Sequence, residues 1–435
     1  MMELAERLCR EAVRRGAQFA EASVDRTRGI EVEIDGNSLK SAEEGDSSSV
    51  SVSAYIGGGR GTFSGHGIGE KDALAGVERA VSLARASSPD PDFRSIAENL
   101  PAPEVGGLYD DAVKSLKAAT LVDWALAMVE EARAVDASAL VFGQARSAVQ
   151  WGAFCNSLGI RDTYGSTFAA IDAYAVVRRS EDTGSFQEFE ESRSLAGLKT
   201  RGVGERAARE ALRYLGARQM RSGEFPVVLG PLAVESFIEA ILESAGADHV
   251  QRNRSFLGGR LGKKIGSKDL TVIDDGTRAG GVESSSRDAE GFPRKPLTVI
   301  EEGVLRSYLH NTYTALKAST QSTGHCAFGG ATAPTNIIIR PGRASAQEII
   351  ADTREGLYIS MAELAADPAS SELSATVDFG FKIENGRLAF PVANTMVAGR
   401  ALEMLAAIDA VSSDYREIPG SVFPTMRIAR MQVSG

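Results

Sequence analysis

The segment Pro226–Ala245, which reads PVVLGPLAVESFIEAILESA, places a short apolar strand directly before a helix. Within Leu232–Ala245, apolar residues occupy positions 234, 237, 238, 241, 242 and 245, which is the spacing of one helical face. The opposite face carries Glu235, Glu239 and Glu243, each one turn from the next. The pattern predicts an amphipathic helix whose apolar face packs on a core and whose other face presents a row of carboxylates.

The composition is that of a folded globular protein. The chain has 435 residues, of which 43% are hydrophobic and 24% charged, so it is long enough for two domains with substantial cores. Its net charge of −10 repels phosphate backbones and argues against a nucleic-acid partner. No apolar run reaches the roughly 18 residues that a membrane span requires, and the N-terminal residues lack the apolar core of a signal peptide. We therefore expect a cytoplasmic protein without a membrane partner.

Cysteine and histidine offer few soft metal ligands. Cys9, Cys155 and Cys326 are odd in number and far apart in the sequence, so they do not predict a disulfide framework. His310, His325 and Cys326 form the one cluster of soft ligands in the second half, but adjacent residues such as His325 and Cys326 rarely coordinate one ion together. A nucleophilic role for Cys326 requires a base, for which His310 is the candidate.

The first half of the chain alternates helical and strand patterns without a repeating strand–helix–strand unit. Helices are predicted at 3–15, 71–86, 118–134 and 204–215, and strands at 20–25, 30–34, 49–55, 61–65, 139–145, 148–154 and 166–177. The dipeptide at 35–36, Asp-Gly, predicts a hairpin turn, and residues 87–103, rich in Ser, Pro and Asp, predict a connecting loop. The fold class is therefore α+β, with an N-terminal domain, 1–220, in which helices pack on a mostly antiparallel sheet.

The second half is rich in glycine and in strand patterns. Strands are predicted at 270–273, 297–300, 304–308, 335–340, 357–361, 376–382 and 388–392, and a helix at 401–407. The dipeptide at 385–386, Asn-Gly, predicts a hairpin between the last two strands. A domain boundary at 218–223 then leaves a strand-rich C-terminal domain, 221–435.

Several segments of the second half together resemble the TldD/TldE (PmbA) peptidase family. They are TVIDDG (271–276), DAEGFP (288–293), GVLRSYLHNTYTA (303–315), STGH (322–325), PTN (334–336) and FKIENGRLAFPV (381–392). Each segment alone is weak, but their order and spacing together are specific. The resemblance implies a TldD/PmbA-like C-terminal domain. In the catalytic TldD-type members of the family, the helix that follows the strand Pro226–Gly230 here carries HExxxH.

This chain departs from the catalytic pattern at all three metal ligands. The positions that match HExxxH read IEAILE, from Ile238 through Glu239 to Glu243, so the glutamate is present and both histidines are absent. The family's third ligand is a cysteine near the C-terminus, and the matching tail, 416–435, contains none. Catalytic zinc needs about three protein ligands. The resemblance therefore implies a TldE/PmbA-type subunit without a metal of its own, in which Glu239 has no metal-bound water to deprotonate.

Polar residues of the family-like segments are the candidates for binding. They are Asp274, Asp275, His310, His325 and Asn336. Asp274 and Asp275, followed by glycine, are either paired carboxylates or a turn, and the same alternatives hold for Asp288 and Glu290. Phosphate-loop and serine-hydrolase motifs are absent, so neither nucleotide hydrolysis nor that class of ester hydrolysis is supported.

The resemblance implies one function and leaves an alternative open. It implies the non-catalytic subunit of a heterodimeric zinc metallopeptidase, with zinc in a TldD-type HExxxH partner chain and extended peptides as substrates, including unfolded or modified peptides and leader peptides. The alternative is a self-sufficient homodimer that binds peptides or a metabolite, or a specialised amide hydrolase in natural-product tailoring. A chaperone-like binder outside the family's function is a third hypothesis.

Overall fold

The first half of the chain forms one long antiparallel sheet with helices on one face. The computed structural model describes residues 1–435. The elements of this half are α1 (Met2–Arg14), β1 (Phe19–Asp35), β2 (Ser38–Ile56), β3 (Gly59–His66), α2 (Glu70–Ala86), α3 (Asp111–Lys114), α4 (Ala118–Val135), β4 (Leu140–Asn156), β5 (Arg161–Arg179), β6 (Asp182–Ser192) and α5 (Val203–Arg213). The strand order is β3-β2-β1-β4-β5-β6, with every neighbouring pair antiparallel.

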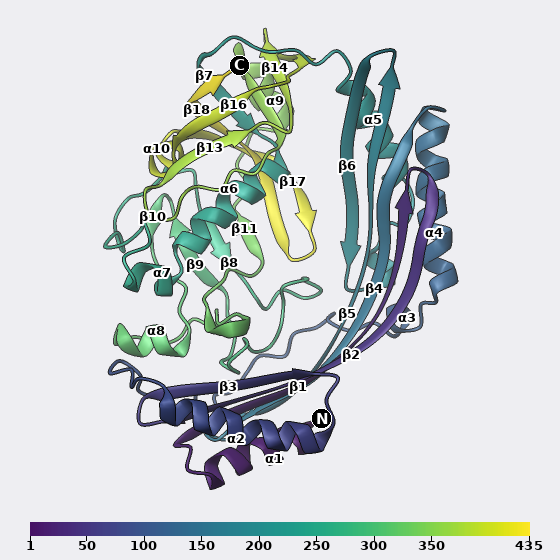
Figure 1. Cartoon of the computed structure of the whole chain (residues 1–435). Coiled ribbons are helices and arrows are strands. Elements are labelled where there is room, and N and C mark those ends of the chain that lie inside the picture. The colour runs from purple at the N-terminus through teal and green to yellow at the C-terminus, as the bar shows by residue number, and fades with distance from the viewer.

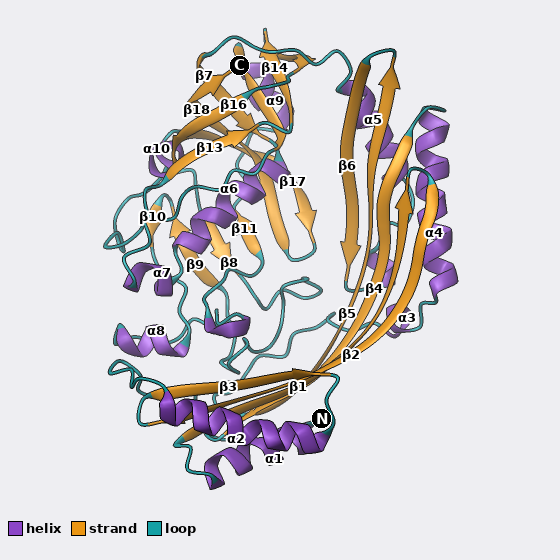
Figure 2. Ribbon diagram, viewed as in Figure 1, coloured by secondary structure: helices purple, strands orange, loops and turns teal.

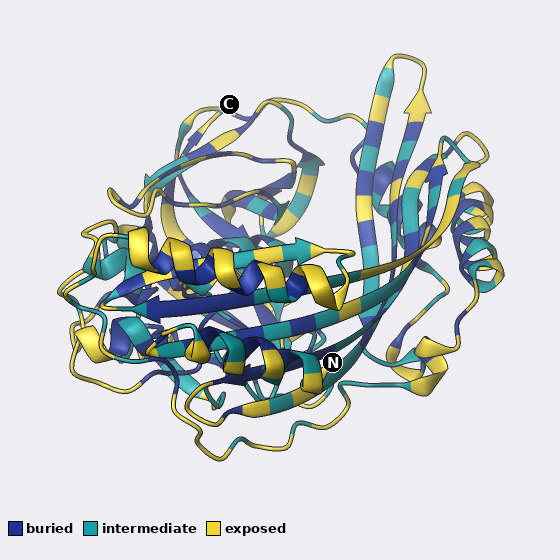
Figure 3. Cartoon of the chain, turned by 60° about the horizontal axis from the view of Figure 1, so that its bottom comes forward, coloured by how far each residue is buried: buried dark blue, intermediate teal, exposed yellow.

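Side-chain alternation along β4 explains why both pairs of helices lie on the same face of the sheet. Val141 and Ala145 pack in the apolar cluster of α4 and α5, and Cys155 packs in the cluster of α1 and α2. These residues are an even number apart, so their side chains share one face. Phe142 and Arg146 point to the other, concave face and are exposed. Figure 3 shows this alternation of buried and exposed residues along the long strands.

The second half builds a mixed sheet that lies on the concave side of the first (Figure 1). Its elements are β7 (Gly223–Leu229), α6 (Pro231–Ser244), α7 (Ala247–Gln251), β8 (Val272–Asp274), β9 (Leu297–Glu301), β10 (Val304–Leu305), α8 (Thr312–Lys317), β11 (Ile337–Ile339), α9 (Ala346–Asp352), β12 (Glu355–Met361), β13 (Glu372–Thr376), β14 (Phe379–Glu384), β15 (Arg387–Pro391), β16 (Met396–Arg400), α10 (Ala401–Ala406), β17 (Ile408–Ile418) and β18 (Ser421–Ser434). The longest path through the sheet is β10-β9-β8-β11-β18-β7-β12-β14-β15. Figure 2 shows that strands dominate both halves.

Helix α6 is held in the largest apolar core of the molecule. Pro231 occupies its first turn, where a missing backbone N–H costs no helical hydrogen bond. Phe237, Ile238, Ile241 and Leu242 are each 0% exposed and belong to a core cluster of 42 residues. Full burial of such side chains stabilises the fold by about 1.5–3 kcal/mol each. The apolar face predicted for this helix is therefore the face that anchors it.

The two halves contact each other through an aromatic cluster and an ion pair. Tyr214, just after α5, stacks on Phe186 of β6 with ring centroids 5.8 Å apart, and meets Phe379 and Phe381 of β14 at 5.1 and 4.8 Å. A short ion pair joins Arg416 of β17 to Glu188 of β6, at 2.6 Å. These contacts fix one end of the C-terminal half against the edge of the N-terminal sheet.

The α+β class and the main helices are confirmed, whereas several predicted strands have the wrong extent. β1 and β4 are continuous, although breaks were expected at 26–29 and 146–147. β6, β17 and β18 lie outside every predicted strand. The strands predicted at 304–308 and 335–340 shorten to β10 and β11, and the one at 376–382 is interrupted between β13 and β14.

The residues missed in β1 and β2 are mostly polar, so hydrophobic periodicity does not reveal them. In β1 and β2, Arg26 pairs with Ser48 and Arg28 with Asp46 in register, and ion pairs join Arg26 to Asp46 and Arg28 to Glu44. Backbone pairing and these cross-strand charges extend the strands past their apolar segments. The division of the chain at residue 220 stays a prediction. None of the helices has the length and apolarity that a membrane crossing needs.

Candidate functional site

The helix that matches the family's metal helix does not present a set of metal ligands. Ile238, at the position of the first histidine, is 0% exposed in the apolar core. Glu239 and Glu243 are exposed on the other face. No group of three or more His, Cys, Asp or Glu side chains in the structure is arranged to hold a metal ion. The donor set around α6 therefore does not fit catalytic zinc.

The glutamate face of α6 is an acidic surface on which two carboxyl groups have raised pKa values. Burial, followed by the nearby charges of Glu239 and Glu191, raises the pKa of Glu235 to about 7. Glu239 is exposed, but partial loss of hydration on the helix surface and the charges of Glu243 and Glu283 raise its pKa as well. Repulsion between carboxylates thus limits how many of them are ionised at once.

The C-terminal tail lies beside this helix. β18 pairs antiparallel with β7, the strand that leads into α6, and also with β17 and β16. In register, Met426 of β18 faces Leu229 and Ile428 faces Val227. The structure thus brings together the two segments that hold the metal in TldD-type chains, and here both contribute apolar side chains to the core.

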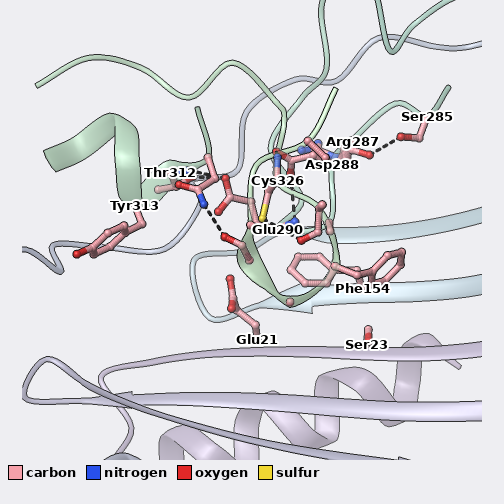
Figure 4. A pocket seen from close by; sticks show the side chains of 18 of the residues that line it. Glu21, Ser23, Phe154, Ser285, Arg287, Asp288, Glu290, Thr312, Tyr313 and Cys326 are labelled. Atoms are coloured by element: carbon pink, nitrogen blue, oxygen red, sulfur yellow. Dashed lines mark hydrogen bonds between the residues drawn. The ribbon is translucent and has the colours of Figure 1, made fainter. Parts of the chain in front are cut away.

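A large cavity lies elsewhere, between the N-terminal sheet and the loops of the C-terminal half. Its volume is about 950 Å³. One wall comes from β1, β2 and the start of β3, with Glu21, Tyr55 and Arg60. The facing wall comes from the DAEGFP turn, the start of α8 and the segment 326–331. Figure 4 shows Glu21 rising from the sheet toward Glu290 and Cys326 on the opposite wall.

Glu290 and Asp288 of the DAEGFP turn are fixed by hydrogen bonds at the cavity wall. Glu290 accepts hydrogen bonds from the backbone N–H and the hydroxyl of Thr312, both at 2.7 Å, which caps the start of α8. Asp288 accepts from the backbone N–H groups of Glu290, Phe292 and Cys326 at 3.1, 2.9 and 3.1 Å. The alternative of a turn at Asp288–Glu290 is correct, and Gly291, at φ +81°, closes it.

These two carboxyl groups titrate far above their ordinary range. Burial raises the pKa of Asp288 to about 6, against the opposing effect of Arg294. Burial, followed by the charge of Asp288, raises the pKa of Glu290 to about 8. Burial also raises the pKa of Glu21, although a hydrogen bond of 2.7 Å from the Tyr55 hydroxyl opposes the shift. Groups that exchange protons near neutral pH in a cavity are candidates for general acid–base chemistry.

The Cys326 thiol is not activated as a nucleophile. Burial, followed by the charges of Glu290 and Asp288, raises its pKa well above the ordinary value. No hydrogen bond joins it to His310: the Cys326 sulfur lies 3.5 Å from the Ala327 carbonyl, and His310 Nδ1 lies 3.2 Å from the Thr314 hydroxyl. The structure therefore gives Cys326 the character of a protonated wall residue.

Most cationic side chains of the cavity are already engaged. Arg193 donates to the carbonyls of Gly281 and Val282, and Arg294 donates to the Ser285 hydroxyl and the Gly324 carbonyl. Arg60 instead lies exposed at the mouth, 5.7 Å from the centre of the Tyr55 ring. Arg252, which also lines the cavity, is exposed as well.

The five predicted binding residues lie behind the cavity wall and not on its surface. Asp274 is 0% exposed and accepts hydrogen bonds from the backbone N–H of Thr335, at 2.7 Å, and from its hydroxyl. His325 Nε2 lies 3.1 Å from Asp274 Oδ1 without a well-directed hydrogen bond, while its Nδ1 lies 2.9 Å from the Thr323 hydroxyl. These side chains hold Thr335, which does line the cavity.

Asn336, Asp275 and His310 play the same supporting part. Asn336 is 0% exposed and donates to the Asp275 carbonyl and to the Ser284 hydroxyl at 2.7 and 2.9 Å. The Asp275 carboxylate accepts from the backbone N–H and hydroxyl of Thr277, which makes it a turn residue. The His310 carbonyl accepts from the Ser322 and Thr323 hydroxyls. The structure brings these segments together, as their family-like order implies.

The N-terminal wall of the cavity was not predicted from the sequence. Glu21 lies on a strand in which Glu21, Ser23 and Asp25 alternate with Ala22 and Val24. That alternation is the available signal, because it places a carboxylate on the polar face of β1. Nothing in the sequence indicates that this face lies opposite the DAEGFP turn.

Comparison with known proteins identifies the fold and the family. Residues 222–435 match the family model described as the PmbA/TldA metallopeptidase C-terminal domain. Metalloprotease PmbA of Escherichia coli O157:H7 is 23% identical over 435 residues, which covers 96% of this chain and 92% of that protein. The chain belongs to the TldD/TldE (PmbA) family. It is therefore a metallopeptidase-like protein of this family.

Two further relatives show how much of this chain resembles the TldD/TldE family. A metalloprotease of Methanocaldococcus jannaschii is 34% identical over 215 residues, a match that spans only about half of either protein, 48% of each. The crystal structure of TldE from Thermococcus kodakarensis superimposes with a TM-score of 0.91 at 21% identity, over 99% of this chain and 100% of that one. The TldD/PmbA-like fold thus extends over the whole chain.

Proposed function

We propose that this chain is the non-catalytic subunit of a heterodimeric TldD/TldE-type zinc metallopeptidase. In this proposal a TldD-type HExxxH chain supplies zinc and cleavage, and the pair acts in the cytoplasm on unfolded or modified peptides and on leader peptides. The observation that carries the proposal is the burial of Ile238, which is 0% exposed at the position of the first metal ligand. The name TldE of the solved neighbour from Thermococcus kodakarensis agrees with it.

The donor set of this chain supports that role. Glu239 and Glu243 remain on α6, but a buried isoleucine replaces one histidine and apolar strand residues face the helix from β18. A pair of exposed carboxylates one turn apart lacks the nitrogen and sulfur ligands that hold zinc tightly. The polar, exposed face of α6 is then available for contact with the partner chain.

The cavity gives this chain a role in substrate access. At about 950 Å³ it accommodates several residues of an extended peptide, and its mouth carries Arg60 beside Tyr55. An extended peptide recognised through its backbone and a few polar contacts is bound with little dependence on sequence. Such binding suits a subunit that guides diverse peptides to a catalytic centre in its partner.

A second candidate is a self-sufficient amide hydrolase, and the pKa values of the cavity favour it. Asp288 and Glu290 have pKa values of about 6 and 8, so one group is mostly ionised and the other mostly protonated at pH 7. Two carboxyl groups in different protonation states are a known arrangement for acid–base hydrolysis. Against this candidate, hydrogen bonds to the backbone of the turn and to Thr312 occupy both groups.

A reconstitution experiment separates the two candidates. The chain is assayed for hydrolysis of unfolded peptides alone, with a TldD-type HExxxH chain, and with that chain after zinc chelation. The proposal expects no turnover by this chain alone and zinc-dependent turnover by the mixture, above that of the HExxxH chain alone. Chelator-resistant turnover by this chain, abolished by Glu290→Gln, establishes the second candidate instead.

A further inference from the structure

Two buried cysteines that are remote in the sequence meet in the N-terminal half. Cys9 of α1 and Cys155 of β4 are 146 residues apart, and their sulfur atoms lie 3.4 Å from each other. The Cys9 thiol also lies 3.4 Å from the Cys155 carbonyl. Both side chains are almost wholly buried, at 5% and 2% exposure. Their spacing in the sequence does not predict the pair, because only the packing of α1 on β4 brings them together.

The geometry is close to that of a disulfide without being one. A sulfur–sulfur bond is about 2.05 Å long, so the two sulfur atoms must approach by about 1.4 Å. Rotation of the two side chains about their Cα–Cβ bonds provides movement of that size. The surrounding side chains include the small residues Ala5, Ala12 and Ala22, which are buried in the same cluster.

The two thiols differ in their ease of ionisation. Their shared hydrogen bond lowers the pKa of Cys155, and the same hydrogen bond, with burial, raises that of Cys9. Cys9, whose sulfur lies 3.4 Å from that of Cys155, is placed to resolve an oxidised Cys155. Cys326 has no cysteine beside it and instead lines the cavity from the C-terminal half.

Helix α1 covers the pair, because its buried face packs on the sheet and carries Cys9. α1 is 13 residues long and precedes the first strand. Ion pairs hold it in place, from Arg7 to Glu70, from Glu6 to Arg161 and from Arg15 to Glu78. Local opening of a surface helix exposes the residues beneath it, and a small oxidant needs only a brief opening.

We propose that Cys9 and Cys155 form a reversible redox modification site, oxidised by peroxide to an intramolecular disulfide that links α1 to β4. The Cys155 thiolate attacks one peroxide oxygen, the O–O bond breaks, and hydroxide leaves and is protonated to water. The Cys9 sulfur then attacks the resulting sulfenic acid, loses its proton, and releases a second water as the S–S bond forms. Two thiols give up two electrons, and one hydrogen peroxide becomes two waters.

The disulfide fixes the back of the cavity wall. Cys155 lies directly opposite Ala22 of β1 in the sheet register. The next residues on these two strands, Phe154 and Glu21, line the cavity. Oxidation thus joins β4, which carries Phe154 and pairs with the strand of Glu21, to helix α1.

Thiol counting in the full-length protein tests the proposal. The native protein is treated with hydrogen peroxide, denatured, alkylated and digested, and the cysteine peptides are identified by mass spectrometry. We expect loss of two of the three alkylated thiols, a Cys9–Cys155 cross-linked peptide, and recovery of all three thiols after dithiothreitol. The cross-link closes a long loop, so the oxidised protein is expected to melt roughly 5 °C or more above the reduced one.

Matched variants keep the test decisive. Cys326→Ser is expected to form the cross-link as wild type does, whereas Cys9→Ser and Cys155→Ser are expected to form none. If a serine variant fails to fold, the wild-type and Cys326→Ser peptide maps still decide. Three results would overturn the proposal. Peroxide leaves all three native thiols reactive, it oxidises a cysteine to sulfinate without the cross-link, or it joins either residue to Cys326.

Discussion

Glu290 accepts two hydrogen bonds of 2.7 Å from Thr312, one from the backbone N–H and one from the hydroxyl. This contact joins the DAEGFP turn to the start of α8 and holds a carboxyl group on the wall of the main cavity. Burial, followed by the charge of Asp288, raises its pKa to about 8. The Glu290 side chain thus both holds the turn against α8 and carries a proton that titrates near pH 8.

Stability is expected to fall as the pH rises from about 5 to 8. The folded state holds the Glu290 proton up to a pKa of about 8, whereas the unfolded chain releases it near 4.5, so the native state binds more protons in this window. Glu290→Gln keeps an acceptor for Thr312 and removes the titration. Between pH 5 and pH 8, we expect the free energy of unfolding of wild type to fall by roughly 1–3 kcal/mol more than that of the variant. Urea denaturation at each pH measures both.

The matched control for this pH dependence is Glu98→Gln, at an exposed glutamate. It is expected to follow the wild-type pH profile. Equal slopes for wild type and Glu290→Gln would show that Glu290 is ionised throughout, contrary to its place in the cavity wall.

Histidines introduced on α6 are not expected to create a zinc enzyme. Ile238→His with Glu243→His restores the HExxxH pattern, but no cysteine follows in the tail 416–435. The imidazole at 238 also replaces a side chain that is 0% exposed, which is expected to cost about 2–4 kcal/mol of stability. Elemental analysis after gel filtration measures bound zinc, and stoichiometric zinc with peptide turnover would show that the third ligand exists elsewhere. Glu243→His alone, at an exposed site, is the control for surface zinc binding.

Asn336 is expected to be a stabilising residue of the cavity wall. Asn336→Ala leaves the Asp275 carbonyl and the Ser284 hydroxyl without the donor that now lies at 2.7 and 2.9 Å. Buried polar groups without partners are costly, so we expect a loss of about 2–4 kcal/mol in urea denaturation. Asn99→Ala removes an exposed hydrogen bond to the Gly159 carbonyl and is expected to cost less than about 1 kcal/mol. Similar losses of stability for the two variants would show that the buried hydrogen bonds of Asn336 do not stabilise the cavity wall.

The aromatic junction between the two halves is expected to contribute strongly to stability. Tyr214→Ala removes contacts to Phe186, Phe379 and Phe381 and is expected to cost about 3–5 kcal/mol. Tyr214→Phe loses only the hydrogen bond to the Ser360 hydroxyl, at 2.9 Å, and is expected to cost about 1 kcal/mol. Chemical denaturation measures both, with Tyr415→Ala, at a half-exposed tyrosine, as the control. A mild effect of Tyr214→Ala would mean that the halves are joined mainly elsewhere.

Apolar periodicity predicts the helices of this protein well and its longest strands poorly. The helix predicted at 232–245 is α6, Pro231–Ser244, because its apolar face packs in a core and leaves a clear pattern. Strand β2 extends over Ser38–Ile56, and its first half is polar and exposed. That part is held by backbone pairing with β1, the other strand of the hairpin. The residues of one strand alone do not indicate such pairing.

The site was predictable only in part for a similar reason. Three of the family-like segments, 288–293, 303–315 and 334–336, contribute residues to the cavity, but the predicted residues Asp274, His325 and Asn336 lie one layer behind its surface. Polar residues within such segments either face a ligand or hold the backbone that does, and sequence order does not separate these roles. Glu21 contributes from a strand more than two hundred residues away from Glu290, which only the folded chain brings near it.

The proposed subunit role is tested most directly by native mass spectrometry of this chain mixed with a TldD-type HExxxH chain. The account predicts a complex that contains both chains and zinc, in which zinc stays with the HExxxH chain when the complex is dissociated in the gas phase. This chain alone is predicted to retain no stoichiometric zinc. Zinc bound one-to-one to this chain, or failure of the two chains to associate while this chain alone hydrolyses peptides, would contradict the account.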